Sequence, residues 1–227
     1  MNKTIEYYNK NARGYFERTF TAEMNPVYEH FIKLLKPGSH ICDLGCGSGR
    51  DSKYFISQGF TVTPIDGSLE MCKLANNILK QKVICQKFNE IDYNNKFDAI
   101  WACASLLHVQ KNKLSGIINK LIQAAKDNAV IYTCFKIGNS ERIVDGKYFA
   151  DYNQNEISNF LLKHESLKLV DMWISNDVRN PQKNPQWLNI IVKIIKSTQQ
   201  LPTPLFSSIV KKLLALRQAQ VQRLSAK

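Results

Sequence analysis

Hydrophobic and polar residues alternate along the chain in two different patterns. Short apolar runs, which are typical of buried strands, are separated by segments whose apolar residues recur at helical spacing. The runs that predict strands are 40–44, 61–65, 82–85, 97–103 and 129–135. The segments that predict helices are 3–18, 26–35, 50–58, one that opens at 67–68, 113–126 and 154–164. This alternation predicts an α/β fold with a mostly parallel, doubly wound sheet.

Two further apolar runs, 167–174 and 187–195, follow the last predicted helix, and the turn-rich segment 175–186 joins them. They predict an antiparallel pair of strands that closes the sheet. The stretch 136–152 reads as an irregular, polar and aromatic loop that leaves the ligand side of the sheet. We expect Arg142 and Tyr148 in it to contact substrate, and a solvated surface loop is the alternative.

The first strand runs into a glycine-rich turn that opens a helix. Gly45, Gly47 and Gly49 occupy alternate positions directly after this strand. Strand, glycine loop and helix in this order are typical of a nucleotide-cofactor site, because glycine lets the backbone approach a ligand closely. The dinucleotide pattern G-x-G-x-x-G fails, since its sixth position is Arg50, and the phosphate-binding P-loop pattern is absent.

Two acidic residues narrow the choice of cofactor. Asp43 ends the first strand, where a negative charge disfavours a pyrophosphate and favours a cationic ligand. Asp66 ends the second strand, where a carboxylate can accept both ribose hydroxyls of an adenosine. A ribose, a positive centre and no phosphates describe S-adenosylmethionine. The alternative is a glycine turn that holds no ligand.

With the segment Asp43–Gly49, D-L-G-C-G-S-G, the chain resembles the class I S-adenosylmethionine-dependent methyltransferases. The resemblance implies a Rossmann-like seven-stranded sheet with an antiparallel C-terminal hairpin and an N-terminal helical lid. The cofactor contacts that it implies are Tyr15, Asp43, Gly45, Cys46, Gly47, Gly49, Arg50, Asp66, Gly67, Met71, Phe88, Asn89 and Cys103. Among them Met71 is expected to pack on adenine or to belong to the core, and Phe88 to cover the adenine face. Asn89 is expected to bond the adenine amine, with Glu90 and Asp92 as alternatives.

The segment after strand 97–103 is expected to face the reacting methyl group. His108 is the histidine placed there, and its ordinary pKa of ~6.5 suits it to take a proton near neutral pH. We therefore predict that His108 is the catalytic base for a hydroxyl or ammonium acceptor, or positions the substrate if the acceptor is a soft anion, with a structural hydrogen bond as the alternative. The resemblance also favours the helix 3–18 as a lid with Tyr8 at the substrate, although this segment also reads as an ordinary amphipathic helix on the domain edge.

Composition and charge divide the chain into three parts. With 227 residues and 44% hydrophobic content, we expect a helical lid at 1–38, a cofactor-binding domain at 39–195, and a linker with a basic amphipathic helix at 196–227. Half of the net charge of +12 lies in this last part. It is expected to pack on the domain, to bind a protein partner or an anionic surface, or to open a further domain.

The N-terminus does not read as a signal peptide, and no apolar run is long enough to span a membrane. The six cysteines form no C-x-x-C pair and accompany no histidine cluster, which predicts buried thiols in a reducing cytoplasm and no metal site.

The sequence therefore predicts an S-adenosylmethionine-dependent methyltransferase that acts in line on a small-molecule acceptor with an oxygen, nitrogen or soft sulfur- or tellurium-type nucleophile. The run Arg50-Asp51-Ser52 also resembles the tellurite-resistance branch, which hints at a soft anion or thiol. A nucleic-acid methyltransferase that uses the basic tail is the first alternative, although Ala102-Cys103-Ala104-Ser105 replaces the D/N-P-P-Y/F of base-flipping enzymes. A non-catalytic cofactor-binding protein is the second.

Overall fold

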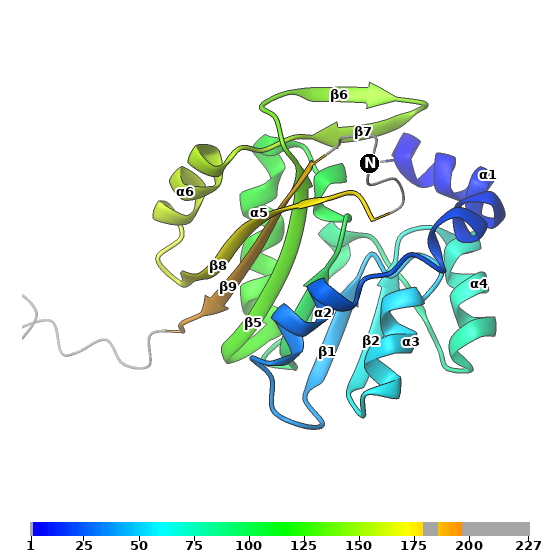
Figure 1. Cartoon of the computed structure of the whole chain (residues 1–227), viewed down its shortest axis with the longest axis horizontal. Coiled ribbons are helices and arrows are strands. Elements are labelled where there is room, and N and C mark those ends of the chain that lie inside the picture. Colours follow the sequence, from blue (N-terminus) through cyan, green and yellow to red (C-terminus); the bar gives the residue numbers. More distant parts are fainter. Residues whose placement is uncertain (1, 179–185, 197–227) are drawn as a thin grey trace, which may run out of the picture. The chain divides into compact units, whose positions relative to one another are not determined.

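The computed structural model describes residues 2–178 and 186–196, and its centre is a seven-stranded sheet of order β3-β2-β1-β4-β5-β9-β8 (Figure 1). The strands are β1 (His40–Leu44), β2 (Thr61–Asp66), β3 (Ile84–Cys85), β4 (Phe97–Ala102), β5 (Ala125–Lys136), β8 (Leu167–Asn176) and β9 (Gln186–Ile194). Strands β1 to β5 pair with one another in parallel, whereas β9 is antiparallel to both β5 and β8. The predicted Rossmann-like sheet with a closing antiparallel pair is confirmed.

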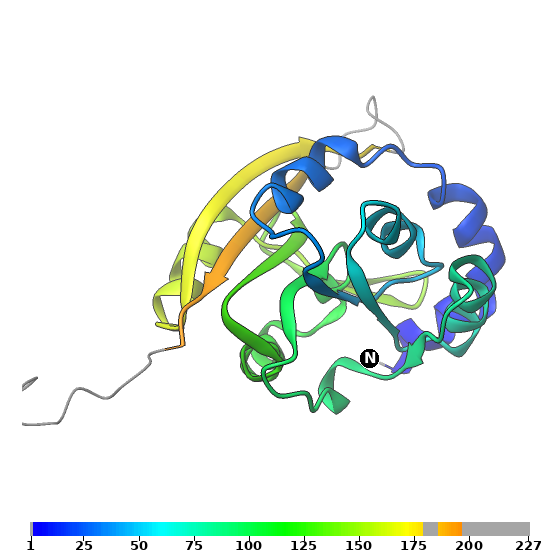
Figure 2. The ribbon, with the colours of Figure 1, turned by 90° about the horizontal axis from the view of Figure 1, so that it is seen from below.

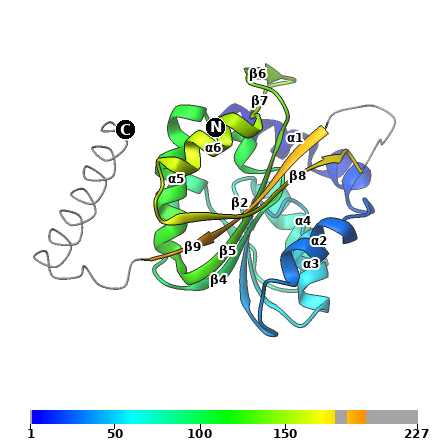
Figure 3. The ribbon, with the colours of Figure 1, turned by 60° about the vertical axis from the view of Figure 1, so that its left-hand side comes forward.

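Helices pack on both faces of this sheet (Figure 3). The α-helices are α1 (Asn2–Thr19), α2 (Asn25–Ile32), α3 (Arg50–Ser57), α4 (Leu69–Leu79), α5 (Lys111–Ala124) and α6 (Gln154–Leu162). Along β4, Trp101 packs with Phe31 of α2 and Phe55 of α3, while its neighbour Ile100 belongs to the cluster that contains Leu121 of α5. Because both faces are buried, the central strands read as continuous apolar runs.

The antiparallel strands β8 and β9 arch side by side around one edge of the fold (Figure 2). Helix α2 packs on β8, where the rings of His30 and Trp173 stack with centroids 4.4 Å apart. His30 Nδ1 also lies 3.1 Å from a carboxylate oxygen of Asp171. These contacts hold the N-terminal helices over the strands that come last in the described chain.

The sequence predicts an irregular loop at 136–152, and this prediction is wrong. The stretch contains a hairpin of two strands, β6 (Glu141–Val144) and β7 (Lys147–Ala150). Asp145 and Gly146 form its turn with φ angles of 51° and 79°. A two-residue turn with both φ angles positive favours Asp-Gly and matches the twist of the strands that it joins. The hairpin lies beside α1 at the ligand end of the sheet (Figure 1).

Strand β5 begins at Ala125, earlier than the predicted 129, and α5 ends at Ala124 rather than 126. Ala125 pairs with Phe97 of β4, and Asn128, with a φ of 63°, lies where the register shifts. Strand pairing therefore overrides the helical periodicity at this point. Within residues 2–178 and 186–196, no helix is long and apolar enough to cross a membrane. The predicted linker and basic helix at 197–227 lie outside the described residues.

Candidate functional site

The glycine loop lies between the end of β2 and the segment that follows β4. The backbone N–H groups of Gly45 and Cys46 both donate to the carbonyl of Ile65, at 2.8 and 3.0 Å. Gly45 has a φ of +79°, and a Cβ built on it would lie only 2.5 Å from the Cβ of Ser105. Only glycine therefore fits at this position, both for its left-handed backbone and for its close packing.

Two cavities adjoin at the ends of these strands, and they share a wall. We call the smaller, of about 90 Å³, the Asp66 cavity and the larger, of about 200 Å³, the Lys147 cavity. The residues of the shared wall are Tyr8, Tyr15, Gly45, Gly47, Cys103, Ala104 and His108. The Asp66 cavity adds Thr4, Ile5, Asp66, Gly67, Ser68, Met71, Lys87, Phe88 and Ser105. Predicted site residues from distant parts of the chain thus line adjacent spaces.

Asp66 is held at the end of β2 by backbone donors. Its Oδ2 accepts from Gly47 N at 2.9 Å, and its Oδ1 accepts from Ser68 N at 2.7 Å. Each carboxylate oxygen can still accept a further hydrogen bond, because it has two lone pairs. Burial raises the pKa of Asp66, and the backbone donors oppose this shift. Its placement suits a pair of ligand hydroxyl groups.

The predicted adenine contacts separate into two groups. Met71 and Phe88 line the Asp66 cavity, and Met71 is also fully buried; their contacts with adenine stay predictions. Asn89, in the 3-10 helix Phe88–Glu90, is exposed and is not among the residues that line either cavity. Gly49 also lies off the cavities, where a Cβ would meet Leu79 at 3.1 Å, so it permits close helix packing.

Asp43 does not supply the exposed negative charge that the sequence predicts. Its side chain is buried behind the loop, does not line either cavity, and accepts a hydrogen bond from Ser52 Oγ at 2.6 Å. Burial and the neighbouring Asp51 raise its pKa to about 8, so the group is mostly protonated at neutral pH. Burial, which the sequence pattern cannot measure, decides the charge of this carboxyl group.

A second acid, Asp51, lines the Lys147 cavity together with the predicted Arg50. Its carboxylate accepts from Arg50 Nε at 2.6 Å, from the hydroxyl of Tyr28 at 2.6 Å and from Trp101 Nε1 at 2.8 Å. Burial raises the pKa of Asp51, but Arg50 and these hydrogen bonds outweigh it and hold the pKa below its ordinary value. The Arg50–Asp51 pair is therefore an ionised and locally neutralised part of the wall.

His108 lies in the shared wall with both ring nitrogens hydrogen-bonded. Its Nδ1 lies 2.6 Å from the carbonyl oxygen of Tyr148, and its Nε2 lies 2.9 Å from the hydroxyl of Tyr8. A carbonyl can only accept, so Nδ1 carries the hydrogen and Tyr8 donates to Nε2. Burial lowers the pKa of His108 to about 4, with Lys147 and Lys136 adding to the shift, and the Tyr148 carbonyl opposing it. The imidazole is neutral at physiological pH.

Helix α1 brings Tyr8 and Tyr15 over the junction of the cavities. The helix is kinked at Asn11, with φ −118° and ψ 16°, and the two tyrosine rings meet edge to face at 5.2 Å. Lys147 Nζ lies 4.2 Å from the ring centroid of Tyr7, which ties the helix to β7. The predicted tyrosines are therefore at the cavities, and the lid role of the segment stays a prediction.

The sequence did not predict which residues form the far wall of the Lys147 cavity. This wall includes Lys136 of β5, Lys147 and Phe149 of β7, and Trp187 and Asn189 of β9. The ammonium groups of Lys136 and Lys147 lie 4.7 and 5.7 Å from the ring centroid of Phe149. The Asp-Gly turn was the available signal, because a hairpin with alternating side chains places Lys147 and Phe149 on one face.

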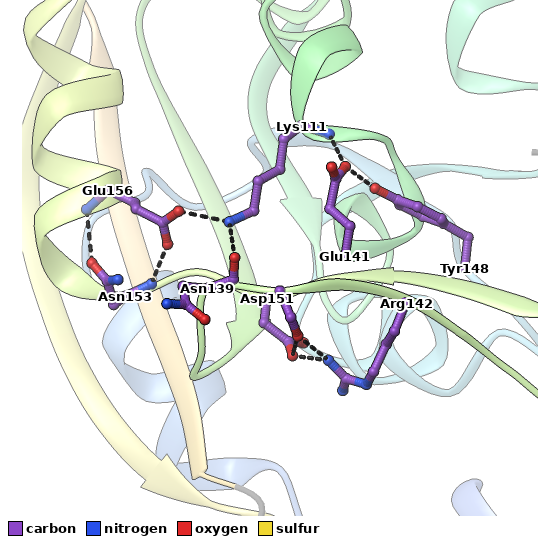
Figure 4. Close-up of polar contacts among 9 residues, drawn as sticks. Lys111, Asn139, Glu141, Arg142, Tyr148, Asp151, Asn153 and Glu156 are labelled. Carbon is purple, nitrogen blue, oxygen red and sulfur yellow. Dashed lines mark hydrogen bonds and ion pairs between the residues drawn. The ribbon is translucent and has the colours of Figure 1, made fainter.

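Arg142 and Tyr148, the predicted substrate contacts, are not among the residues that line the two cavities. Figure 4 shows them in a polar network, in which Arg142 pairs with Asp151 and the hydroxyl of Tyr148 donates to Glu141. In the same network Lys111 Nζ lies 2.6 Å from a carboxylate oxygen of Glu156. The Tyr148–Glu141 bond thus lies within the hairpin, and Arg142 joins β6 to Asp151, the residue that follows β7.

Comparison with known proteins matches part of the chain to a protein family. Residues 41–128 match the model of a family described as a methyltransferase domain. The comparison with curated proteins found no significant match.

Three solved structures illustrate the likeness of the fold. The first is a 1,6-didemethyltoxoflavin-N1-methyltransferase from Burkholderia thailandensis with bound 1,6-didemethyltoxoflavin and S-adenosylhomocysteine, at 19% identity and a TM-score of 0.68, covering 84% of this chain and 85% of that one. The second is an S-adenosylmethionine-dependent methyltransferase from Methanosarcina mazei. Its sequence is 18% identical, its TM-score is 0.64, and the match covers 75% of this chain and 97% of that one. The third is a magnesium protoporphyrin IX methyltransferase from Synechocystis with bound S-adenosylmethionine. Its sequence is 18% identical, its TM-score is 0.63, and the match covers 86% of this chain and 97% of that one.

At such identities the solved structures establish the fold, while the family match covers the glycine loop, β1 to β4 and the helices between them. Both comparisons agree with the predicted class: residues 41–128 match a methyltransferase domain, and the fold is that of solved S-adenosylmethionine-dependent methyltransferases.

Proposed function

We propose that this protein transfers a methyl group from S-adenosylmethionine to a small-molecule acceptor. The observation that carries the proposal is the pair of adjoining cavities, which meet at Gly45, Ala104 and His108. Methyl transfer requires that the nucleophile of one ligand and the methyl group of the other be aligned across a short distance. Two separate spaces with one shared wall meet that requirement.

The Asp66 cavity fits the cofactor. Asp66 has acceptor capacity left for ribose hydroxyls, and Met71 and Phe88 offer an apolar surface for adenine. Ser105 Oγ is buried, lines this cavity and has no hydrogen-bond partner among the described residues. Because such a group costs free energy when unpaired, a polar ligand atom is its expected partner. These residues would hold the adenosine and the amino-acid part of the cofactor.

When bound, the cofactor supplies a methyl group on a sulfonium, which is already a good leaving group. The protein then has to orient the two ligands and exclude water. His108 and Tyr8 lie in the wall between the cavities, and their hydrogen bond fixes the orientation of both. We propose that they position the acceptor, since a neutral imidazole with a pKa of about 4 is a weak base.

The size and lining of the Lys147 cavity support a small acceptor. Its volume is about 200 Å³, and Tyr132, Phe149 and Trp187 contribute aromatic surface. Two of the similar structures are named for non-polymeric compounds, 1,6-didemethyltoxoflavin and magnesium protoporphyrin IX. Both observations favour a small molecule over a nucleic acid as the acceptor.

The first experiment is a calorimetric titration of the full chain with S-adenosylmethionine and S-adenosylhomocysteine, with NAD as the control. We expect micromolar binding of the first two and none of NAD. Binding of NAD, or of none of the three, would contradict the cofactor assignment. Tight cofactor binding with no formation of S-adenosylhomocysteine across a broad acceptor panel would instead favour a non-catalytic protein. Salt-dependent DNA or RNA binding would favour the nucleic-acid alternative.

A further inference from the structure

We infer that the acceptor is a small organic anion, bound by Lys136 and Lys147 in the larger cavity and methylated on its charged atom. The inference rests on the proposed methyl transfer and adds the substrate class. The lysines come from different elements, β5 and β7, and both line the cavity. Their ammonium groups lie 4.7 and 5.7 Å from the centroid of the same ring, Phe149, which also lines the cavity.

The charges that line the cavity leave a positive excess. Arg50 and Asp51 are in direct contact at 2.6 Å and offset each other. The remaining charged residues in the described lining are Lys136, Lys147 and Asp177, so cations outnumber carboxylates. In a partly buried space a single excess charge acts more strongly on a ligand than it would in water. The lining therefore favours a ligand with a negative charge over a neutral or cationic one.

The apolar part of the same lining describes the rest of the acceptor. Phe149 lies directly beside the ammonium groups, and Tyr132 and Trp187 line the same space. Flat apolar walls next to ammonium groups fit an aromatic or other ring-sized body that carries one acidic group. A cavity of about 200 Å³ limits that body to a few rings at most.

The charge of the acceptor also removes the need for a base. In the transfer, a lone pair on the anionic oxygen or sulfur forms the new bond to the methyl carbon. The bond from that carbon to the sulfonium sulfur breaks, and its electron pair stays on sulfur. The negative and positive charges cancel, and no proton has to leave the acceptor. A step without a base is consistent with the state of His108, which is neutral and already accepts a hydrogen bond from Tyr8.

Benzoate and benzamide test the inference, because they have the same ring but differ in charge. The full chain, saturated with S-adenosylhomocysteine, is titrated with each, and binding is followed by calorimetry. The variant is Lys147→Gln. The matched control is Lys96→Gln, since Lys96 Nζ also lies over an aromatic ring, Tyr93 at 4.4 Å, but away from the cavity. The affinity for S-adenosylhomocysteine reports on the fold of each variant.

We expect benzoate to bind at least tenfold more tightly than benzamide, and Lys147→Gln to weaken benzoate about tenfold while benzamide is unchanged. Lys96→Gln should change neither. Equal binding of both probes, or benzoate binding that is insensitive to Lys147→Gln, would overturn the inference. So would the failure of both probes to bind a protein that still binds S-adenosylhomocysteine. Failure to bind S-adenosylhomocysteine itself would contradict the proposed function instead.

Discussion

The two cavities differ in how they are built and in the charge that they present. The Asp66 cavity is formed largely by consecutive elements, from the glycine loop through β2 and α4 to Phe88, and its described lining holds one carboxylate, Asp66, and one cation, Lys87. The Lys147 cavity draws on α1, β5, β7, β8 and β9, and its described lining has an excess of cations. The two cavities therefore differ in the balance of charge in their described linings, so substitutions should separate the two functions.

The largest expected effect comes from Gly45→Ala, in the wall that both cavities share. The new Cβ would lie 2.5 Å from that of Ser105, and alanine would have to adopt a φ of +79°. We expect a loss of about 2–5 kcal/mol of stability, from ~1–2 for the left-handed backbone and ~1–3 for overpacking. Denaturant unfolding measures this loss, and ligand titration should show both sites weakened.

Gly47→Ala is the matched control for this substitution. Gly47 also has a positive φ, +55°, but a Cβ there would meet nothing within 4 Å. Its cost should be limited to the backbone term, about 1–2 kcal/mol. Equal costs for the two variants would show that the approach of Gly45 to Ser105 does not matter.

His108 should make the free energy of unfolding depend on pH. Its pKa falls from 6.5 to about 4 on folding, so the unfolded chain binds the proton more tightly. The stability that the neutral ring contributes is fully present above pH 6.5. It is lost as the pH falls toward 4, because the unfolded chain takes up the proton first, and the loss is roughly 3 kcal/mol. Unfolding by urea at several pH values measures this slope.

His108→Asn should lack that part of the slope, and the difference between the two proteins isolates it from the other titrating groups. A variant whose stability follows the same pH curve as the parent would contradict a buried, neutral His108.

Asp66→Ala should affect the cofactor cavity alone. The change removes the acceptor for ribose hydroxyls and the partner of Gly47 N and Ser68 N. We expect the affinity for S-adenosylhomocysteine to fall by about 10- to 100-fold, or ~1.5–3 kcal/mol for bonds to a charged group. Calorimetry measures it, and Asp92→Ala, at an exposed acid, is the control. Unchanged affinity in Asp66→Ala would exclude the ribose role.

The smallest effect is expected for Tyr8→Phe, which removes the hydroxyl that donates to His108 Nε2 at 2.9 Å. Leaving this nitrogen without its donor should cost about 1 kcal/mol of stability and slow turnover with little change in cofactor affinity. Tyr7→Phe keeps the ring that packs edge to face on Tyr8, at 5.6 Å, and serves as the control. Turnover that falls equally in both variants would contradict a specific role for Tyr8.

The sequence could predict the fold and the Asp66 cavity because both depend on local patterns. The glycine loop, Asp66, Met71 and Phe88 all lie within a segment that alternates strand and helix, and the structure has them together. The spacing of apolar residues also sufficed for β8 and β9, although it misplaced the start of β5.

The Lys147 cavity could not be predicted in the same way, because its residues meet only after the sheet has formed. Lys136 and Lys147 belong to separate strands, and no spacing in the sequence brings them to one ring. The charge of Asp43 depends on burial, and the orientation of Arg142 depends on its partner Asp151. The Asp-Gly turn of the hairpin was the one local signal for this wall, and it was overlooked.

The position of β9 in the sheet has a consequence for the synthesis of the protein. β9 is the last described strand along the chain, yet it lies between β5 and β8. A nascent chain therefore carries β5, whose residues 129–135 are all buried in the finished fold, with one edge unpaired until residues 186–194 emerge from the ribosome. Unpaired apolar edges recruit other chains. A chain interrupted before β9 should aggregate rather than fold, even though its methyltransferase motif is complete.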